Sequence, residues 1–209
     1  MLLAEQLALI ALDPDSGRAA MGTRDNLNAC LAGLLVAEVH LDDRPESALL
    51  TAAGEVFEQA GPKMKAVLSA MGRGLDRRLG LGTWDAVIAG LVDARVVAPT
   101  SGGLRPRNEV LDRSARDAIV ERLRAVTAQD DPMDVRTALL VSMTGPAQLL
   151  ELIAPERSGR RHARERIDHA LDGTFSQPIA DTVRAVIADA AAAVAASVVA
   201  VTVVTSASS

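Results

Sequence analysis

Basic residues that could bind an anionic group occur in two places in the first half of the chain. Arg18 and Arg24 flank the start of an expected helix, and a second group follows further on: Arg73, Arg77 and Arg78. Guanidinium groups bind phosphate through paired, charge-assisted hydrogen bonds. If the fold brings both groups together beside Trp84, they would form a site for an anionic lipid headgroup or a phosphate. The alternative is that Arg73 and Arg77, one helical turn apart, lie on an ordinary solvated face.

A second basic run begins at Arg157 and is interleaved with acidic residues. It comprises Arg157, Arg160, Arg161, His162, Arg164 and Arg166, with Glu156, Glu165 and Asp168 among them. Such mixing is typical of an exposed helix held by salt bridges, and a partner surface is the alternative. His162 and His169 share a helix face, but metal sites on one helix use ligands at i and i+4, as in H-E-x-x-H. The spacing therefore favours exposed polar residues, and we expect no metal site.

Motifs of known enzyme classes are missing from the sequence. It contains no G-x-S-x-G, no P-loop and no G-x-G-x-x-G after an expected strand. The single cysteine, Cys30, lies in an apolar segment, where a small buried thiol is the usual role. We expect no catalytic residues and no cofactor, and a metal-dependent enzyme centred on His162 and His169 is a remote alternative.

Composition limits the class of protein further. The chain has 209 residues, 49% hydrophobic and 23% charged, and a net charge of −5, so no global field attracts nucleic acid. Only Phe57, Phe175 and Trp84 are aromatic, which excludes an aromatic base-stacking surface. Arginine strongly outnumbers lysine, which is typical of a GC-rich bacterial genome. A lone cysteine and an N-terminus without a basic segment predict a cytoplasmic protein.

Apolar spacing predicts the elements that would hold these residues. In the first half we expect helices over Leu2–Leu12, from Thr23 or Asp25 to about Val39, over 55–72, and over 83–94 with Thr83 as N-cap. Two short strands are expected around the turn at Asp42–Glu46, and a β-hairpin over 96–107 around the turn cluster Pro99–Gly103.

The second half is expected to be helical, over 109–127, 132–143, 145–153, 157–171 and 177–204. The last of these is rich in Ala and Val, and its uncharged run of about 15 residues is shorter than the roughly 20 needed to cross a bilayer. We therefore expect a buried core helix rather than a membrane span. The predicted fold is mainly α, one globular multi-helix domain over 1–209 with short β-hairpins and this C-terminal helix in the core.

Five stretches of the chain follow one another in a recognisable order. They are LLAEQLALIALDPDSGR, NLNACLAGLLVAEVHLDDR, AGEVFEQA, TWDAVIAGLVDARVVAPTSGGLRPR and MDVRTALLVSMTGPAQLLELIAP. In order and spacing they resemble the Golgi phosphoprotein 3 family over nearly the whole chain. The resemblance implies a mostly helical, non-enzymatic domain with a hairpin that acts at membranes. Eukaryotic members of this family bind phosphatidylinositol 4-phosphate at the Golgi and hold glycosyltransferases there.

The resemblance also indicates where a lipid headgroup would bind. The family uses a Trp at the start of its second helix, an Arg before the Gly of a Leu-Arg-Gly step, and two arginines at i and i+3 near the helix that leads into the hairpin. The corresponding positions in this chain hold Thr23, Ala32, Leu81 and Trp84. The family's headgroup residues are therefore not retained, and any anion site has to use other residues, such as Arg18 and Arg24.

The sequence thus predicts a non-catalytic peripheral binding or adaptor protein of bacterial origin, located in the cytoplasm at the inner face of the membrane. The expected partners are an anionic membrane lipid or a protein, and no nucleic acid. Because the family's hairpin serves in oligomer contacts, the resemblance also implies a homo-oligomer formed through the 96–107 hairpin. The alternative function is a protein–protein interaction or regulatory module that binds no lipid.

Overall fold

The computed structural model describes residues 1–19, 24–41, 46–100, 107–129, 133–172, 174, 177–186 and 188. Over these residues the chain is mainly helical, which confirms the predicted fold class. The elements are α1 (Leu3–Ala11), α2 (Arg24–Val39), α3 (Ala48–Ala60), α4 (Met64–Leu79), α5 (Thr83–Asp93), β1 (Val97–Thr100), β2 (Arg107–Val110), α6 (Arg113–Ala128), α7 (Val135–Thr144), α8 (Leu150–Ile153) and α9 (Arg157–Leu171). Residues 177–186 are also helical.

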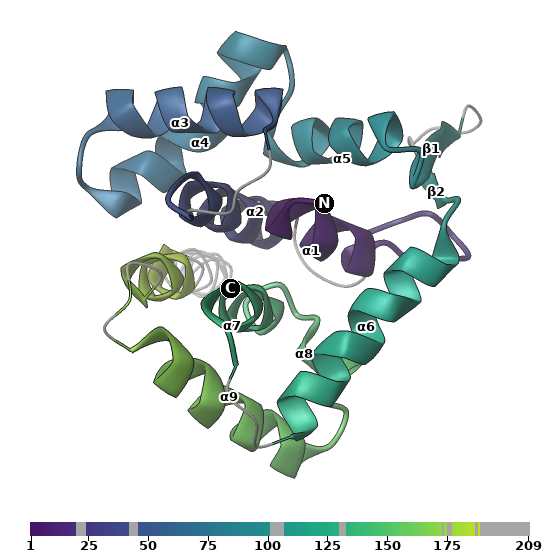
Figure 1. Ribbon diagram of the computed structural model, residues 1–209. Coiled ribbons are helices and arrows are strands. Elements are labelled where there is room, and N and C mark those ends of the chain that lie inside the picture. The colour runs from purple at the N-terminus through teal and green to yellow at the C-terminus, as the bar shows by residue number, and fades with distance from the viewer. Residues whose placement is uncertain are drawn as a thin grey trace, which may run out of the picture.

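Helix α2 lies at the centre of the molecule. It packs against α1, α3, α4, α5 and α7, and Figure 1 shows α3–α5 with the hairpin on one side of it and α7 and α9 on the other. The helical segment 177–186 reaches the same core, because Ile179, Ala180 and Val183 are fully buried. It approaches α2 closely at Gly33, where an added Cβ would lie 2.6 Å from Val183 Cγ2. The described part of the predicted C-terminal helix therefore packs in the core, as expected.

A buried carboxylate joins three of these helices. Glu38 of α2 has no exposed surface, and its two carboxylate oxygens accept from the Leu3 N–H of α1 at 3.0 and 2.9 Å. Arg136 of α7 donates to the same carboxylate at 2.6 Å. Burial raises the pKa of Glu38, and the Arg136 guanidinium and the Leu3 N–H oppose that shift. Glu38 thus satisfies an otherwise unpaired N–H at the start of α1 and fixes both α1 and α7 to α2.

The structure corrects the predicted elements after α2. The strand predicted after the Asp42–Glu46 turn is wrong, because α3 starts at Ala48, with the Ser47 hydroxyl accepting from the Leu49 N–H; residues 42–45 lie outside the described range. The single helix predicted over 55–72 is two helices, α3 and α4. The chain turns at Gly61, which has φ 78°, and Pro62 follows, where the ring cannot continue a helix.

Later elements differ mainly at their ends. The N-cap of α5 is Gly82 rather than Thr83. The helix predicted from 109 begins at Arg113, because β2 continues to Val110 and the Asp112 carboxylate caps α6 by accepting from the Ala115 N–H. The helix predicted over 145–153 is reduced to α8, since the chain turns after Thr144.

A hairpin forms where one was predicted, but its bounds differ: Pro99 and Thr100, predicted as turn, belong to β1, and β2 extends to Val110, past the predicted end at 107. β1 and β2 pair antiparallel, with Val97 opposite Val110 and Thr100 opposite Arg107. The predicted turn residues 101–103 and the end of the C-terminal helix beyond 188 lie outside the described residues.

Candidate functional site

A cleft of about 540 Å³ opens beside the only tryptophan of the chain. The turn after α1, the start of α2, one face of α5 and the hairpin form its walls. Its lining includes Gly17, Arg18, Arg24, Leu27, Leu81, Trp84, Asp85, Ile88, Val92, Asp93, Pro99 and Asn108. We call it the Trp84 cleft.

The turn after α1 places Arg18 at this cleft. The Asp13 carboxylate accepts from the backbone N–H groups of Asp15 at 3.2 Å and Ser16 at 2.7 Å. Hydrogen bonding to Ser16 is the main cause that lowers the pKa of Asp13. Gly17 has φ 64° and lies so close to β2 that an added Cβ would be 2.8 Å from the Asn108 carbonyl oxygen. The Asn108 N–H donates to the Gly17 carbonyl at 2.9 Å. The acidic turn is therefore held against the hairpin, and Arg18 follows directly.

Helix α5 forms the opposite wall and is joined to α2 at its first turn. The Trp84 N–H donates to the Asn28 side-chain oxygen at 3.1 Å, which satisfies one of the unpaired N–H groups at the start of α5. The indole is 7% exposed and belongs to the hydrophobic core. Trp84 is thus a core residue that also lines the cleft.

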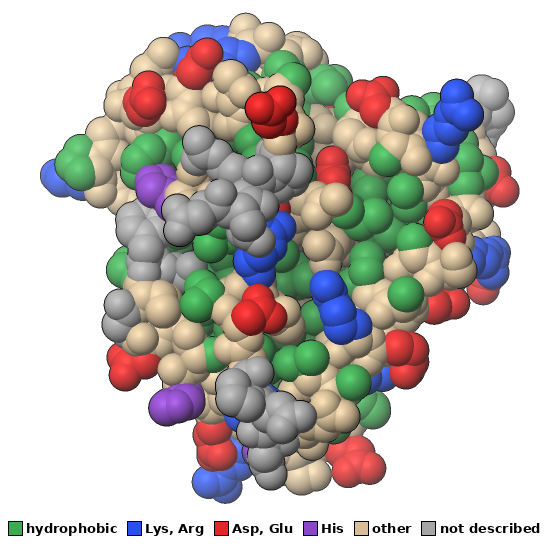
Figure 2. All heavy atoms as spheres, viewed as in Figure 1, with side chains coloured by type: hydrophobic (Ala, Val, Ile, Leu, Met, Phe, Trp, Pro, Cys, Tyr) green, Lys and Arg blue, Asp and Glu red, His purple; other side chains and the backbone are tan. Residues whose placement is uncertain are grey.

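The charges of the Trp84 cleft are balanced. Arg24 Nη2 lies 2.7 Å from Asp85 Oδ1, and both side chains are more than half exposed, at 61% and 54%. The second acid of the lining is Asp93, and the second arginine is Arg18. On the face shown in Figure 2, acidic and basic side chains are interspersed in the same way over the surface of the molecule. An exposed pair of this kind contributes little stability, so Arg24 can exchange its partner at low cost.

The structure brings together only some of the predicted site residues. Arg18, Arg24 and Trp84 line one cleft, whereas the α4 arginines Arg73, Arg77 and Arg78 do not line it. Arg78 instead pairs with Glu55 of α3 at 2.8 Å. Of the family headgroup positions, Leu81 and Trp84 line the cleft, Ala32 is buried inside α2, and Thr23 lies outside the described residues.

Comparison with known families decides the identity of the fold. The family model described as Golgi phosphoprotein 3 (GPP34) matches residues 3–190. The chain belongs to the Golgi phosphoprotein 3 family. A search of curated proteins gives no match. Leu81 and Trp84, which the sequence resemblance assigns to the headgroup site, both line the Trp84 cleft.

The described part of the chain shows neither a cluster of metal ligands nor a membrane-spanning helix. No group of three or more His, Cys, Asp or Glu residues there could hold a metal ion. His162 and His169 both lie on α9. Of the helices described, none combines the length and the apolar character that crossing a membrane requires.

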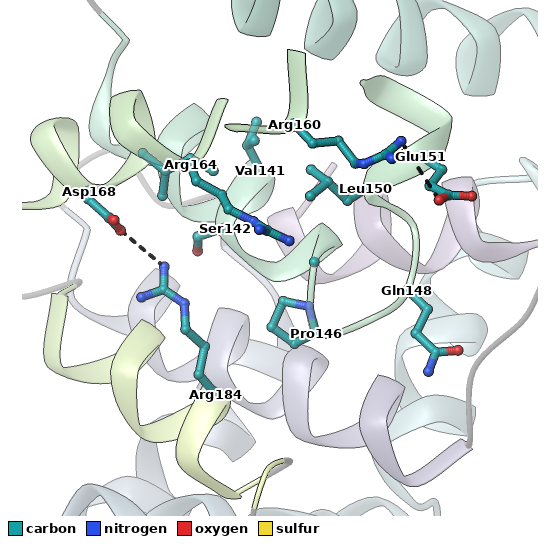
Figure 3. Close-up of a pocket in the computed structure, with 12 residues that line it drawn as sticks. Val141, Ser142, Pro146, Gln148, Leu150, Glu151, Arg160, Arg164, Asp168 and Arg184 are labelled. Atoms are coloured by element: carbon teal, nitrogen blue, oxygen red, sulfur yellow. Dashed lines mark ion pairs between the residues drawn. The ribbon is translucent and has the colours of Figure 1, made fainter. Parts of the chain in front are cut away.

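A second cavity, of about 630 Å³, was not expected from the sequence. It lies between α7, the turn after it, α9 and the segment 177–186 (Figure 3), and its lining includes Arg160, Arg164 and Arg184. We call it the Arg164 pocket. The prediction of an exposed, salt-bridged α9 holds for Arg161, which pairs with Glu165 at 3.0 Å, but Arg160 and Arg164 turn toward this pocket. Their i, i+4 spacing places them on one helix face, whereas nothing in the local sequence pattern indicates that Arg184 joins them.

Proposed function

We propose that the chain is a non-catalytic, peripheral binding protein that holds an anionic lipid headgroup in the Trp84 cleft at the inner face of a membrane. The observation that carries this proposal is that Arg18, Arg24 and Trp84 line one cleft, together with Leu81, a second position that the resemblance assigns to headgroup binding. Membership of the Golgi phosphoprotein 3 family supports a binding role, because that family acts through bound lipids and proteins.

The charges of the cleft favour a headgroup with one negative charge. Arg18 and Arg24 face Asp85 and Asp93, so the cleft has no surplus of positive charge to balance a phosphoinositide. The i, i+3 arginines that the family uses are replaced by Leu81 and Trp84, which cannot form paired bonds to a phosphomonoester. A headgroup such as phosphatidylglycerol needs only one guanidinium, and Arg24 becomes available when Asp85 releases it.

Vesicle co-sedimentation tests this proposal. Vesicles of phosphatidylcholine containing phosphatidylglycerol should bind the protein at low salt and less at physiological salt, because screening weakens exposed charge interactions. A protein with both Arg18→Gln and Arg24→Gln should bind several-fold less. The matched control carries Arg73→Gln and Arg77→Gln, which are exposed and do not line the cleft, and it should bind like wild type. No binding even at low salt would leave the alternative, an interaction module that binds no lipid.

The hairpin supports a second binding role, self-association. Among the described residues β1 and β2 form a two-stranded sheet, and Thr100, Arg107 and Glu109 on it are exposed. Exposed strand edges can pair with another chain. Gel filtration with light scattering should show a dimer or larger species. A monomer at all concentrations would contradict this role of the hairpin.

A further inference from the structure

The Arg164 pocket combines basic side chains with an apolar floor. Arg160 and Arg164 come from α9, and Arg184 comes from the segment 177–186 (Figure 3). The floor is formed by Val141, Pro146, Leu150 and Ile167. Among the described residues this pocket shares no lining residue with the Trp84 cleft.

Arg160 and Arg184 are held at the two sides of the pocket by partners around its rim. Arg160 Nη1 donates to the Pro155 carbonyl at 2.5 Å and lies 3.7 Å from Glu151 Oε1. Arg184 lies 2.9 Å from Asp181 on its own segment and 3.6 Å from Asp168 on α9. Both guanidinium groups are therefore positioned before any ligand arrives, which lowers the entropy cost of binding.

Two of these ion pairs can open at low cost. The distances to Glu151 and Asp168 are 3.7 and 3.6 Å, and these carboxylates are 81% and 63% exposed. Exposed, loosely spaced pairs contribute little stability. A phosphate group can therefore replace the two carboxylates as partner of Arg160 and Arg184.

Arg164 is the side chain that gives the pocket its character. It is exposed, and within the described ranges no hydrogen bond or ion pair is found for its guanidinium. Figure 3 shows it extending between the other two arginines toward Pro146, into the middle of the cavity. Because the guanidinium of Arg164 points into the cavity, its N–H donors are available to a ligand there.

We propose that the Arg164 pocket binds a phosphate group carried on a small, uncharged organic body. Arginine suits phosphate because the planar fork donates two parallel hydrogen bonds. The apolar floor suits the body that carries the phosphate, and about 630 Å³ is within the usual range for small-molecule sites. The same phosphomonoester chemistry is available from a soluble metabolite or from a lipid headgroup.

The test uses phenyl phosphate as the probe, with inorganic phosphate for comparison, in calorimetric titrations of the full chain. Phenyl phosphate should bind more tightly than inorganic phosphate, because its ring covers the apolar floor. Arg164→Gln should weaken phenyl phosphate binding about tenfold or more, since one charge-assisted bond is removed. The matched control is Arg161→Gln on the same helix, whose side chain is 84% exposed and does not line the pocket, and it should bind like wild type.

A vesicle arm identifies the source of the phosphate. A lipid-borne phosphate would be supported if the protein sediments with phosphatidylcholine vesicles that contain phosphatidic acid, if this binding depends on Arg164, and if phenyl phosphate does not bind. Binding of phenyl phosphate that depends on Arg164 would support a soluble ligand. The proposal is overturned if wild type binds none of these probes, or if Arg164→Gln binds them as wild type does. The variant with Arg18→Gln and Arg24→Gln should keep phenyl phosphate binding, which separates this proposal from that for the Trp84 cleft.

Discussion

The Trp84 cleft and the Arg164 pocket use arginine in different ways. In the cleft two arginines face two aspartates, and Arg24 is already in close contact with Asp85 at 2.7 Å. In the pocket Arg160 and Arg184 lie 3.7 and 3.6 Å from Glu151 and Asp168, and Arg184 also pairs with Asp181 at 2.9 Å. Arg164 extends between them and has no partner among the described residues. The cleft contains two of the positions that the resemblance assigns to headgroup binding, whereas the pocket has the arrangement that we propose for phosphate.

The difference shows that the number of arginines is a poor guide to anion binding. A guanidinium without an acidic partner, such as that of Arg164 among the described residues, can bind a ligand directly, whereas Arg24 must first leave Asp85, at the low cost of an exposed pair. Leu81 and Trp84 bring no charge to the cleft. Arg164 and Arg184 supply charge at a place that the family positions do not indicate.

Replacement of Glu38 should have the largest effect, because its carboxylate joins α1 and α7 to α2. Glu38→Ala leaves the Leu3 N–H and Arg136 without their buried partner, and we expect a loss of about 3 kcal/mol in the free energy of unfolding. Urea denaturation measures this. The control Glu55→Ala removes an exposed partner of Arg78 and should cost less than about 1 kcal/mol. Equal losses in the two variants would contradict the structural role of Glu38.

Gly33→Ala should damage the Arg164 pocket selectively. The added Cβ would lie 2.6 Å from Val183 Cγ2, so the segment that carries Arg184 must shift. We expect a loss of about 2 kcal/mol in stability, together with weaker phenyl phosphate binding and unchanged binding to phosphatidylglycerol vesicles. Gly72→Ala is the control, since its Cβ would lie at an ordinary 3.6 Å from Thr83 Oγ1. If vesicle binding falls as much as phenyl phosphate binding, the two cavities are not independent.

Asp85→Asn should strengthen the Trp84 cleft. It removes the partner of Arg24, so binding to phosphatidylglycerol vesicles at low salt should rise up to about fivefold, the value of one exposed pair. Asp76→Asn, on the exposed face of α4, removes the same charge elsewhere and serves as the control. An equal increase in both variants would show that only net charge matters.

Cys30 should report that these variants remain folded. Burial raises the pKa of Cys30 to about 12, so the thiol is neutral and covered at ordinary pH. Thiol reagents should leave it unmodified in wild type and in the arginine variants, and should modify it after unfolding in urea. Rapid modification of the native protein would mean that the core around α2 opens readily.

Much of the fold could be predicted from the sequence, because apolar periodicity fixes which segments are helices. α1, α2, α9 and the hairpin were predicted within a few residues. The failures occurred where local signals compete. Pro62 ends a helix that the apolar pattern alone would continue, and the pattern after Asp42 suits a strand as well as the helix that starts at Ala48.

The candidate sites were only partly predictable. The convergence of Arg18 and Arg24 with Trp84 could be proposed, because the resemblance to the Golgi phosphoprotein 3 family implies that the segments carrying these residues lie near one another in the fold. The Arg164 pocket could not, since it needs the segment that carries Arg184 to pack beside α9, and that contact depends on Val183 fitting against Gly33. Such long-range packing leaves no periodic signal in one sequence.

The fluorescence of Trp84 tests most directly the claim that the cleft and the pocket are separate sites. Trp84 is the only tryptophan of the chain, and it lines the Trp84 cleft but not the Arg164 pocket. We predict that phosphatidylglycerol vesicles change its emission, whereas phenyl phosphate, at concentrations where calorimetry shows binding, leaves it unchanged. A change of emission with phenyl phosphate that disappears in the variant with Arg18→Gln and Arg24→Gln would contradict the account, because it would place the phosphate in the Trp84 cleft.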